Sequence, residues 1–405
     1  MLRRVAVAAC LALLAACDSD SGGRGAMAEV ANADWHRKDL NAHLSRWLTV
    51  APTPSGLLQG QFDRNWQAPG KVSGDLTLHS RLVYTMLVGY EATGDARYLE
   101  VAKRGTDFLL ASFHDPLHGG FFQVVDANGK PVSTTKNSYG HAFALLALSH
   151  AARVTREPKY KAAALAAWQD IRRNLREPDG GLRGAAPRDF GPTQEGKHSQ
   201  NPLMHMFEAQ LALIDATGDQ NVLADTRELG DFVLNRLMVG LPDGGAYIPE
   251  WYDAQWKPIT GEDGFTDLGH QFEWSHLLRS AEQRGLPPIY ADVADRLLKF
   301  AVANGYDEQD GGIFNRMSPS GRVDRSKYWW QQAEGMKAFL AVAQRPEMAR
   351  RYHETLELVG KEIIDHDNGG WRFGAKSTCG EGCNKMQPDP YHLVGLDWAV
   401  LSTKQ

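Results

Sequence analysis

The chain has 405 residues, of which 43% are apolar and 23% are charged, and its formal net charge is -5. This length allows either two domains or one large repetitive domain, and the apolar fraction is sufficient for a large core. The acidic balance, with no run of basic residues in the sequence, argues against a nucleic-acid partner.

The first residues, MLRRVAVAACLALLAAC, have the features of a secretory signal. Two arginines precede an apolar run at 5–16 that is too short to cross a bilayer as a helix. The run ends in LAAC, which resembles a bacterial lipobox with lipid attached to Cys17; an ordinary signal peptide cut elsewhere is the alternative. We therefore expect a lipoprotein signal at 1–16 and a flexible tether at 17–33. The protein would be held by lipid alone in the bacterial cell envelope, facing the periplasm.

Two cysteines lie far beyond this segment, Cys379 and Cys383 in the motif CGEGC. In an oxidising compartment, this spacing favours a small loop disulfide. A zinc site is the alternative, and it would need more soft ligands than these two.

A Gly-Gly motif recurs along the chain at intervals of about sixty residues. The copies are HGGFF (118–122), DGGLR (179–183), DGGAY (243–247), DGGIF (310–314) and NGGWR (368–372). Each copy predicts a tight turn followed by extended residues, and an apolar helix begins about twenty residues later. Those helices begin at 140–148, 204–212, 269–277, 330–338 and 391–399, and a sixth, at 80–88, follows GLLQGQF instead of a Gly-Gly motif.

The apolar helices carry apolar residues on nearly all sides, which predicts burial on most sides. Between them lie one-sided helices, such as the one in which Leu229, Phe232, Val233 and Leu237 share a face. Six such pairs predict an all-α closed toroid, an (α/α)6 barrel over residues 34–405. We expect short β-hairpin loops at the mouth of its central cavity, and a first outer helix around 40–48.

A polar residue occupies the second position of every apolar helix when the six are aligned. These residues are Arg81, His141, His205, His270, Gln331 and His392. Equal register in a toroid implies equal height, so we expect the six side chains to converge at the mouth. Three residues further on, Glu208, Glu273 and Glu334 stand one helical turn away, where a carboxylate can orient an imidazole. A single histidine near a helix start is more often structural, so the prediction depends on the column as a whole.

Imidazoles titrate near neutral pH, so two of them facing an arginine suit proton abstraction beside a carbonyl, with Arg81 stabilising the oxyanion. A glycosidase would need two carboxylates flanking the bond instead. The His-x-x-Glu order is the reverse of the di-iron motif and lacks the zinc spacing, so we expect no metal. Trp330, just before Gln331, is expected to offer its face to a sugar.

Five motifs in combination resemble the N-acylglucosamine 2-epimerase superfamily, which includes cellobiose 2-epimerases and mannose isomerases. They are NPLMHMFEA (201–209), GHQFEW (269–274), YWWQQAE (328–334), NGGW (368–371) and PYH (390–392). The resemblance covers nearly all of the chain after the targeting segment. It implies an (α/α)6 barrel enzyme that interconverts aldoses at C2, or an aldose with a ketose, without a cofactor or metal.

The resemblance also implies roles for individual residues. His270 and His392 match the general acid/base pair, Arg81 the arginine at the C1–C2 oxygens, and Glu273 the carboxylate that supports the first base. Contacts with the substrate are implied for Asn201, His205, Tyr139 and Trp330, and His205 is also expected to take part in catalysis. Their places in the column add Glu208, Glu334 and His141 as expected substrate-binding residues.

We therefore predict a carbohydrate isomerase that works through a cis-enediolate, most simply on a monosaccharide such as mannose. Return of the proton to C2 would instead make the protein a sugar 2-epimerase of the N-acylglucosamine or cellobiose type. Disaccharide 2-epimerases that resemble this chain carry a tryptophan where it has Gln387, which disfavours a disaccharide. The alternatives from other classes are a lipid-anchored, non-catalytic sugar-binding protein and an (α/α)6 glycoside hydrolase. The expected partner is a small sugar, and the expected state a monomer or weak homodimer.

Overall fold

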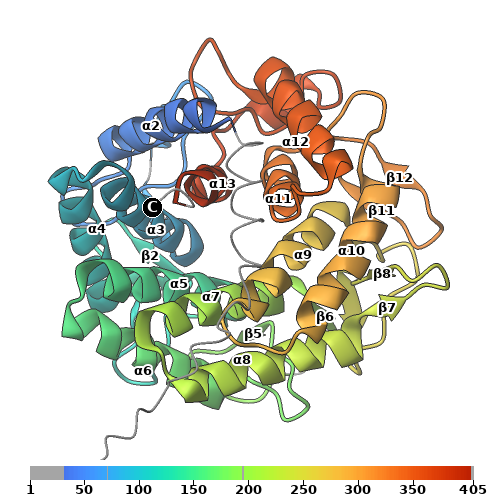
Figure 1. Cartoon of the computed structure of the whole chain (residues 1–405). Helices are drawn as coiled ribbons and strands as arrows, with labels where there is room; N and C mark the ends of the chain where they lie inside the picture. Colours follow the sequence, from blue (N-terminus) through green and yellow to red (C-terminus); the bar gives the residue numbers. More distant parts are fainter. Residues whose placement is uncertain (1–31, 71, 194–195, 403–405) are drawn as a thin grey trace, which may run out of the picture.

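Two concentric rings of helices make up the computed structural model, which describes residues 32–70, 72–193 and 196–402 (Figure 1). The inner ring is α3 (Leu76–Thr93), α5 (Ser138–Thr155), α7 (Asn201–Thr217), α9 (Leu268–Glu282), α11 (Trp329–Leu340) and α13 (Tyr391–Ser402). The outer ring is α2 (Ala33–Val50), α4 (Ala96–Phe108), α6 (Pro158–Asn174), α8 (Gln220–Phe232), α10 (Ile289–Gly305) and α12 (Pro346–Leu358). Each inner helix packs on the next and α13 packs on α3, so the predicted (α/α)6 barrel is confirmed.

The two rings differ in burial as their sequence patterns predict. In α5, residues 140–149 are buried without interruption, which requires an apolar helix on all sides. In α4, by contrast, Tyr98, Ala102 and Gly105 are buried at spacings of four and three, so one face packs inward. The outer helices α4, α8 and α12 end in a π-helical turn, and these turns are η1 (Leu109–Phe113), η2 (Val233–Leu237) and η3 (Val359–Ile363).

The turn between an inner helix and its outer partner is set by a glycine and an aspartate. Gly94 ends α3 in the left-handed region at φ 70°, and Asp95 accepts a hydrogen bond from the backbone N–H of Arg97 at the start of α4. Gly218 and Asp219 repeat this arrangement between α7 and α8. Glycine has no Cβ to oppose the left-handed conformation, and aspartate satisfies a free N–H of the first turn.

Short antiparallel strands lie in the loops that lead into the inner helices. One sheet joins β1 (Ser73–Asp75), β2 (Val124–Asp126) and β3 (Pro131–Ser133), and another joins β10 (Thr266–Asp267), β11 (Arg316–Met317) and β12 (Val323–Asp324). The two-stranded pairs are β4 (Lys136–Asn137) with β5 (Ala185–Ala186), β6 (Lys197–Ser199) with β9 (Trp251–Asp253), and β7 (Val239–Gly240) with β8 (Ala246–Tyr247). Because β1, β4 and β10 run directly into α3, α5 and α9, these strands mark the end of the barrel where the inner helices begin, which is the mouth.

Three Gly-Gly turns at the mouth are closed by a buried or partly buried cation. Asp115 accepts backbone N–H groups within its turn and pairs with the ammonium of Lys136 at 3.1 Å. Lys327 pairs with Asp307 at 2.8 Å, and Arg64 pairs with Asp365 at 2.6 Å. Two consecutive glycines with positive φ make each turn. These loops are therefore fixed to the barrel by charge as well as by backbone geometry.

The ring is closed by a buried contact between its first and last helices. His36 on α2 bonds through Nδ1 to Asp397 on α13 at 2.6 Å, and through Nε2 to the hydroxyl of Tyr352 on α12 at 2.5 Å. All three residues are fully buried. Burial lowers the pKa of His36 to about 4 and raises that of Asp397 well above its ordinary value. The contact is therefore a hydrogen-bonded neutral group rather than an ion pair.

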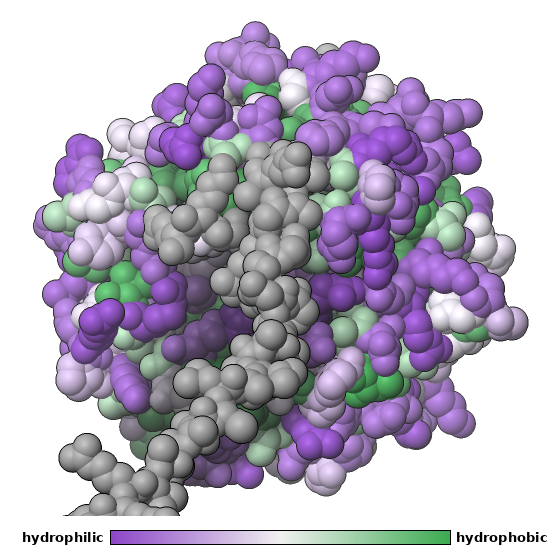
Figure 2. Space-filling model, in the orientation of Figure 1, coloured by the Kyte–Doolittle hydropathy of each residue, from purple (hydrophilic) through white to green (hydrophobic). Residues whose placement is uncertain are grey.

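The predicted signal, Cys17 and residues 17–31 of the expected tether lie outside the described residues. Within residues 32–402, apart from 71 and 194–195, every helix is too short or too polar to cross a membrane. Hydrophilic side chains cover much of the face shown in Figure 2.

Replacing His36 by leucine should weaken the closure, because the change leaves Asp397 and the Tyr352 hydroxyl buried without their partner. We expect the free energy of unfolding to fall by about 3 kcal/mol, measured by urea denaturation. Arg37→Ala, on the exposed side of the same helix, is the control and should change little. Equal unfolding midpoints for His36→Leu and the wild type would contradict the proposed role of this contact.

Candidate active site

The inner helices bring three of the predicted histidines to one place near the mouth. The ring of His205 on α7 lies 6.5 Å from that of His392 on α13. Trp330, at the start of α11, lies 5.6 Å from His392 and 4.9 Å from His270 on α9. The indole is half-buried, so one part of it remains open beside both imidazoles.

Arg81 on α3 completes this group. Its guanidinium donates to the hydroxyl of Tyr139 at 2.8 Å, and the Tyr139 ring lies 5.2 Å from that of His205. It also pairs with Asp389 at 2.9 Å and lies 4.2 Å from the centre of the Phe143 ring. Asp389, which the sequence analysis did not single out, keeps Arg81 charged in spite of its burial and raises its pKa.

His270 is held by a carboxylate that the sequence analysis missed. Its Nδ1 lies 2.9 Å from Glu250 Oε2, and Gln200 Nε2 lies 2.8 Å from both that oxygen and Nδ1. Glu273, the predicted support, makes no such bond, so this expectation is corrected. Glu250 comes from the loop after a Gly-Gly turn, twenty residues before His270 in the chain. The contact between Glu250 and His270 therefore cannot be predicted from residues that lie one helical turn apart.

His392 and His205 are each held by a glutamate as well. His392 Nδ1 lies 2.6 Å from Glu334 Oε1, and His205 Nδ1 lies 3.1 Å from Glu208 Oε2. Glu208 also accepts the hydroxyl hydrogen of Tyr391. Glu334 is fully buried, and the oxygens of Glu208 already accept hydrogen bonds. Each carboxylate therefore orients an imidazole, which corrects the expectation that Glu208 and Glu334 face a substrate. With Nδ1–H donated to the carboxylate, Nε2 of each ring can act as a base.

Glu273 lies among these groups with one oxygen free. Its Oε1 is 4.0 Å from His205 Nδ1, and Oε2 has no hydrogen-bond partner among residues 32–402 that the structure describes. Burial and the neighbouring charge of Glu334 raise the pKa of Glu273 well above its usual range. Protonation of this carboxyl group is therefore favoured, and the side chain can exchange hydrogen bonds with a hydroxylated ligand.

His270 and His392 differ in charge because their surroundings differ. Burial alone lowers the pKa of an imidazole, but Asp267 and Glu250 outweigh it and raise the pKa of His270 to about 10. For His392, burial outweighs the hydrogen bond to Glu334, and the pKa is lowered. His270 is thus protonated and His392 neutral at pH 7. Two titratable groups separated in this way define an acid and a base.

His141 does not join the site, which corrects the expectation that it binds substrate. It is fully buried, with Nδ1 bonded to the Asn137 carbonyl and Nε2 accepting the N–H of Phe121. It belongs to a different column, four residues after the helix N-cap, whose side chains accept the backbone N–H of a mouth loop. The members of this column are His79, His141, Gln271 and Gln332, which accept from Leu58, Phe121, Ile248 and Ile313.

The alignment on the second residue of each apolar segment placed His141 wrongly, because the distance from the helix N-cap to that residue differs between helices. Arg81 lies six residues after the N-cap Asp75, but His270 lies only three after Asp267. Gln331, in the same predicted column, bonds to Asn315 instead. Equal sequence register therefore did not mean equal height in the barrel.

The remaining expectations concern the edges of the site. Tyr139 and Asn201 are half-buried at the first turns of α5 and α7, and Asn201 Oδ1 has no partner among the described residues. Both can contact a ligand. Cys379 and Cys383 form the disulfide that their spacing favours. Next to Cys379, Thr378 accepts the N–H of Lys327, so the loop before α13 is tied to the segment that enters α11.

Two overlapping groups have a spacing that could suit a cation, His205–Glu208–Glu273 and Glu273–Glu334–His392. In both, an imidazole already donates to a carboxylate. The ammonium of Lys337 lies 2.7 Å from Glu334 Oε2 and supplies positive charge in the same place. The histidines, Glu208 and Glu334 are therefore already engaged by hydrogen bonds and an internal cation, whereas Glu273 Oε2 is not.

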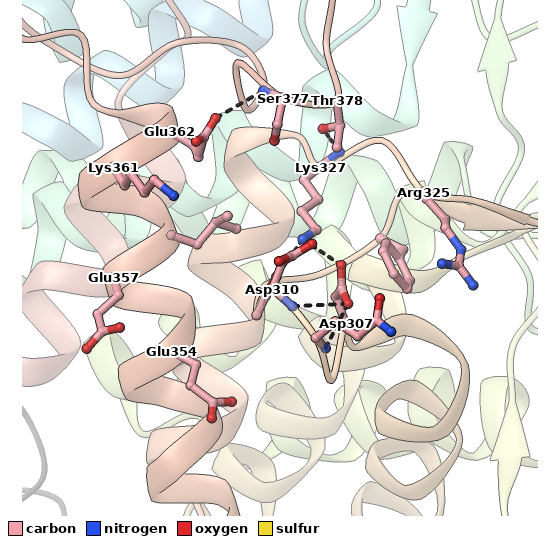
Figure 3. Close-up of a pocket in the computed structure, with 14 residues that line it drawn as sticks. Asp307, Asp310, Arg325, Lys327, Glu354, Glu357, Lys361, Glu362, Ser377 and Thr378 are labelled. Carbon is pink, nitrogen blue, oxygen red and sulfur yellow. Dashed lines mark hydrogen bonds and ion pairs between the residues drawn. The ribbon is translucent and has the colours of Figure 1, made fainter.

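A hollow of about 650 Å³ lies outside the ring, between the end of α12 and the 307–311 turn (Figure 3). Its lining is charged, with Asp307, Lys327, Glu354 and Lys361 among the side chains, and contains no histidine. The ammonium of Lys327 is already paired with Asp307 and hydrogen-bonded to the carbonyl of Gly311. This hollow lacks a residue suited to proton transfer at neutral pH, so the inner site is the candidate.

Comparison with known proteins agrees with the geometry. A family model described as N-acylglucosamine 2-epimerase (GlcNAc 2-epimerase) matches residues 59–395. A cellobiose 2-epimerase of Eubacterium cellulosolvens is 26% identical over 383 residues, 85% of this chain and 92% of that protein. A D-mannose isomerase of Marinomonas mediterranea is 26% identical over 393 residues, 90% of this chain and 96% of that protein. A crystal structure of D-mannose isomerase matches with a TM-score of 0.82 at 22% identity, over 92% of this chain and 98% of the other.

Fold and site together define an (α/α)6 barrel enzyme of the sugar isomerase and epimerase type. Within that class, the chain belongs to the N-acylglucosamine 2-epimerase family.

The separation of the two histidine pKa values can be measured directly. In ¹⁵N-histidine NMR spectra, His270 should titrate near pH 10 and stay protonated at neutral pH. Glu250→Gln removes one of the carboxylates that favour the imidazolium, so the pKa of His270 should fall by a unit or more. Glu262→Gln, on the exposed part of the following loop, is the matched control and should leave it unchanged. A wild-type His270 that titrates near pH 6.5 would contradict this description of the site.

Proposed function

We propose that the protein isomerises an aldose to a ketose at C1 and C2, with His392 as the base and His270 as the acid. The observation that carries this proposal is the pair of imidazoles beside Trp330, one protonated and one neutral, each held through Nδ1 by a buried glutamate. A neutral base and a protonated acid in one site are what enolisation requires.

The reaction is a balanced proton transfer. Nε2 of His392 takes the hydrogen from C2 of an open-chain aldose, and the electron pair moves into the C1–C2 bond while O1 becomes negative. The positive charge of Arg81 stabilises this oxygen, and the protonated His270 can give it a hydrogen. Return of the proton from His392 to C1, with transfer of the O2 proton to the now neutral His270, gives the ketose and restores both imidazoles. No net proton or electron is gained or lost.

A monosaccharide such as mannose is the proposed substrate, and the surroundings of Gln387 support this choice. Gln387 is buried and donates to the carbonyl of Arg64 at 2.7 Å, so it anchors the loop before α13. It offers no aromatic surface for a second sugar ring. The related D-mannose isomerase also covers slightly more of this chain than the related cellobiose 2-epimerase.

Sugar 2-epimerisation is the second candidate, and one feature favours it. His270 and His392 contact Trp330 as two separate imidazoles, so a proton could leave C2 on one side and return from the other. The two outcomes share one enediolate and differ in the carbon atom that receives the proton.

Hydrogen exchange with solvent tests the proposal. In D₂O at pH 7–8, the enzyme should replace the C2 hydrogen of mannose by deuterium and form fructose, followed by ¹H NMR. Glucose and cellobiose are included to reveal epimerisation. His392→Ala should lower the rate by roughly 10²-fold or more, because the base is lost.

Three results would change the assignment, one from that experiment and two from calorimetry and a reducing-end assay. Exchange at C2 without ketose would favour the epimerase. Calorimetric binding of a sugar without exchange would favour a non-catalytic sugar-binding protein. Release of reducing ends from an oligosaccharide would indicate a glycoside hydrolase.

We also propose that lipid on Cys17 anchors the protein in the bacterial cell envelope, with the barrel in the periplasm. The arginines, the apolar run and the LAAC sequence support this. Expression of the full chain in a bacterium with labelled palmitate should give a labelled, membrane-bound product, and Cys17→Ser should abolish the label. Cys10→Ser, within the apolar run, is the matched control. A labelled Cys17→Ser protein would refute the anchor.

A further inference from the structure

The carboxylate that holds the base is shared by three partners. Oε1 of Glu334 lies 2.6 Å from His392 Nδ1, and Oε2 lies 2.6 Å from His276 Nε2 and 2.7 Å from Lys337 Nζ. Glu334 is fully buried, whereas the side chains of His276 and Lys337 are 13% and 14% exposed. Neither His276 nor Lys337 was expected in the site.

Lys337 lies deeper in the barrel than the base. It follows Glu334 by one turn of α11, away from the mouth, and His276 follows Glu273 in the same direction on α9. Several charged or titratable groups interact with this cluster, or with the residues next to it, from neighbouring helices. They are Tyr84 and Arg81 on α3, His150 and Arg153 on α5, Glu208 on α7, Glu273 on α9, and His392 on α13. The ammonium is therefore the cation around which the carboxylates of this region gather.

The two catalytic imidazoles also differ in what their glutamates bind next. Glu250, which holds His270, takes its other hydrogen bonds from Ser199 Oγ at 2.9 Å and Gln200 Nε2 at 2.8 Å, and both are neutral groups. Glu334, which holds His392, takes one from an ammonium. A carboxylate already paired with a cation attracts an imidazolium less strongly. The imidazole is therefore an acid in the Glu250–His270 pair and a base in the Glu334–His392 pair.

We propose that Lys337, assisted by His276, is a positioning residue that keeps His392 neutral. Its ion pair with Glu334 weakens the attraction of that carboxylate for a protonated His392. This inference rests on the proposed function, in which His392 is the base. Lys337 touches neither a substrate nor the reacting atoms, and it acts only through the carboxylate.

The pH dependence of kcat/KM for the sugar that shows C2 exchange is the test. His392 must be neutral to act, so the acid limb of the profile follows its pKa. Lys337→Met removes the ammonium, His392 should then hold its proton more strongly, and the limb should move up by about one pH unit. Activity should fall about tenfold below the limb and little at pH 8. Lys337→Arg keeps the charge and should restore the wild-type limb, and His276→Gln should shift it less than Lys337→Met.

Control variants separate this effect from a general structural one. Lys299→Met removes an equivalent charge from the outer surface of α10, where the side chain is 51% exposed, and should leave the profile unchanged. Lys337→Gln loses the charge but keeps an N–H donor for Glu334, and it replaces the Met variant if that protein does not fold. A folded Lys337→Gln or Lys337→Met protein with the wild-type limb would overturn the inference.

Failure of the proposed function would be distinguishable from failure of this inference. If wild-type protein exchanges no C2 hydrogen with any sugar, the proposed function fails. The pKa of His392 in ¹⁵N-histidine NMR spectra then tests the inference alone: it should be higher in the Lys337 variants than in the wild type, and an equal value would refute it.

Discussion

A buried carboxylate behind each imidazole is the constraint on which the site depends. The three pairs are His205–Glu208, His270–Glu250 and His392–Glu334, and in each the contact is through Nδ1. Such a bond fixes the tautomer and the orientation of the ring, and it leaves Nε2 for chemistry. Burial makes the bond stronger than it would be in water and makes its loss expensive. The barrel supplies that burial by enclosing the pairs within six packed helices.

The partners beyond the carboxylates decide how each pair behaves. Around His270 the additional groups are neutral or acidic, including Asp267 at the N-cap of the same helix. Around His392 they include the ammonium of Lys337 and the guanidinium of Arg81. One repeated unit of helix and loop thus yields an acid and a base, because charged residues were placed differently around two copies of the same pair. Asp389 adds to this control by fixing Arg81 while it also caps the start of α13.

The sequence was informative about the fold because the repeat is carried by backbone geometry. Gly-Gly turns, helix caps such as Gly94–Asp95 and the contrast between apolar and one-sided helices are local signals, and local signals can be read without a structure. The site was only partly predictable. Glu208 was visible because it lies one turn from His205 on the same helix. Glu250, Asp389 and His276 reach their partners from different elements, and no spacing along the chain indicates such contacts. Lys337 lies one turn from Glu334 on α11, but nothing in the sequence indicates that this pair lies behind His392.

The error over His141 has the same origin. Its position in the chain matched the column, but its ring accepts a loop N–H, and the distance from the helix N-cap rather than from the first apolar residue would have separated the two kinds of residue. Gln271 and Gln332 accept a loop N–H in the same way, through the oxygen of a side-chain amide. An imidazole in a repeat of this kind is therefore functional only where its neighbours leave one nitrogen unoccupied.

The closure of the ring by His36 also decides how the protein is presented to its surroundings. His36 lies one turn from the start of α2 and binds Asp397, which lies beyond His392 on α13, on the side away from the mouth. The chain therefore enters the barrel from its rear. The mouth lies at the other end of the inner helices, so the start of α2 and the approach to the imidazoles occupy opposite ends of the barrel. A contact made at the start of α2 therefore leaves the way to the site free for a dissolved sugar.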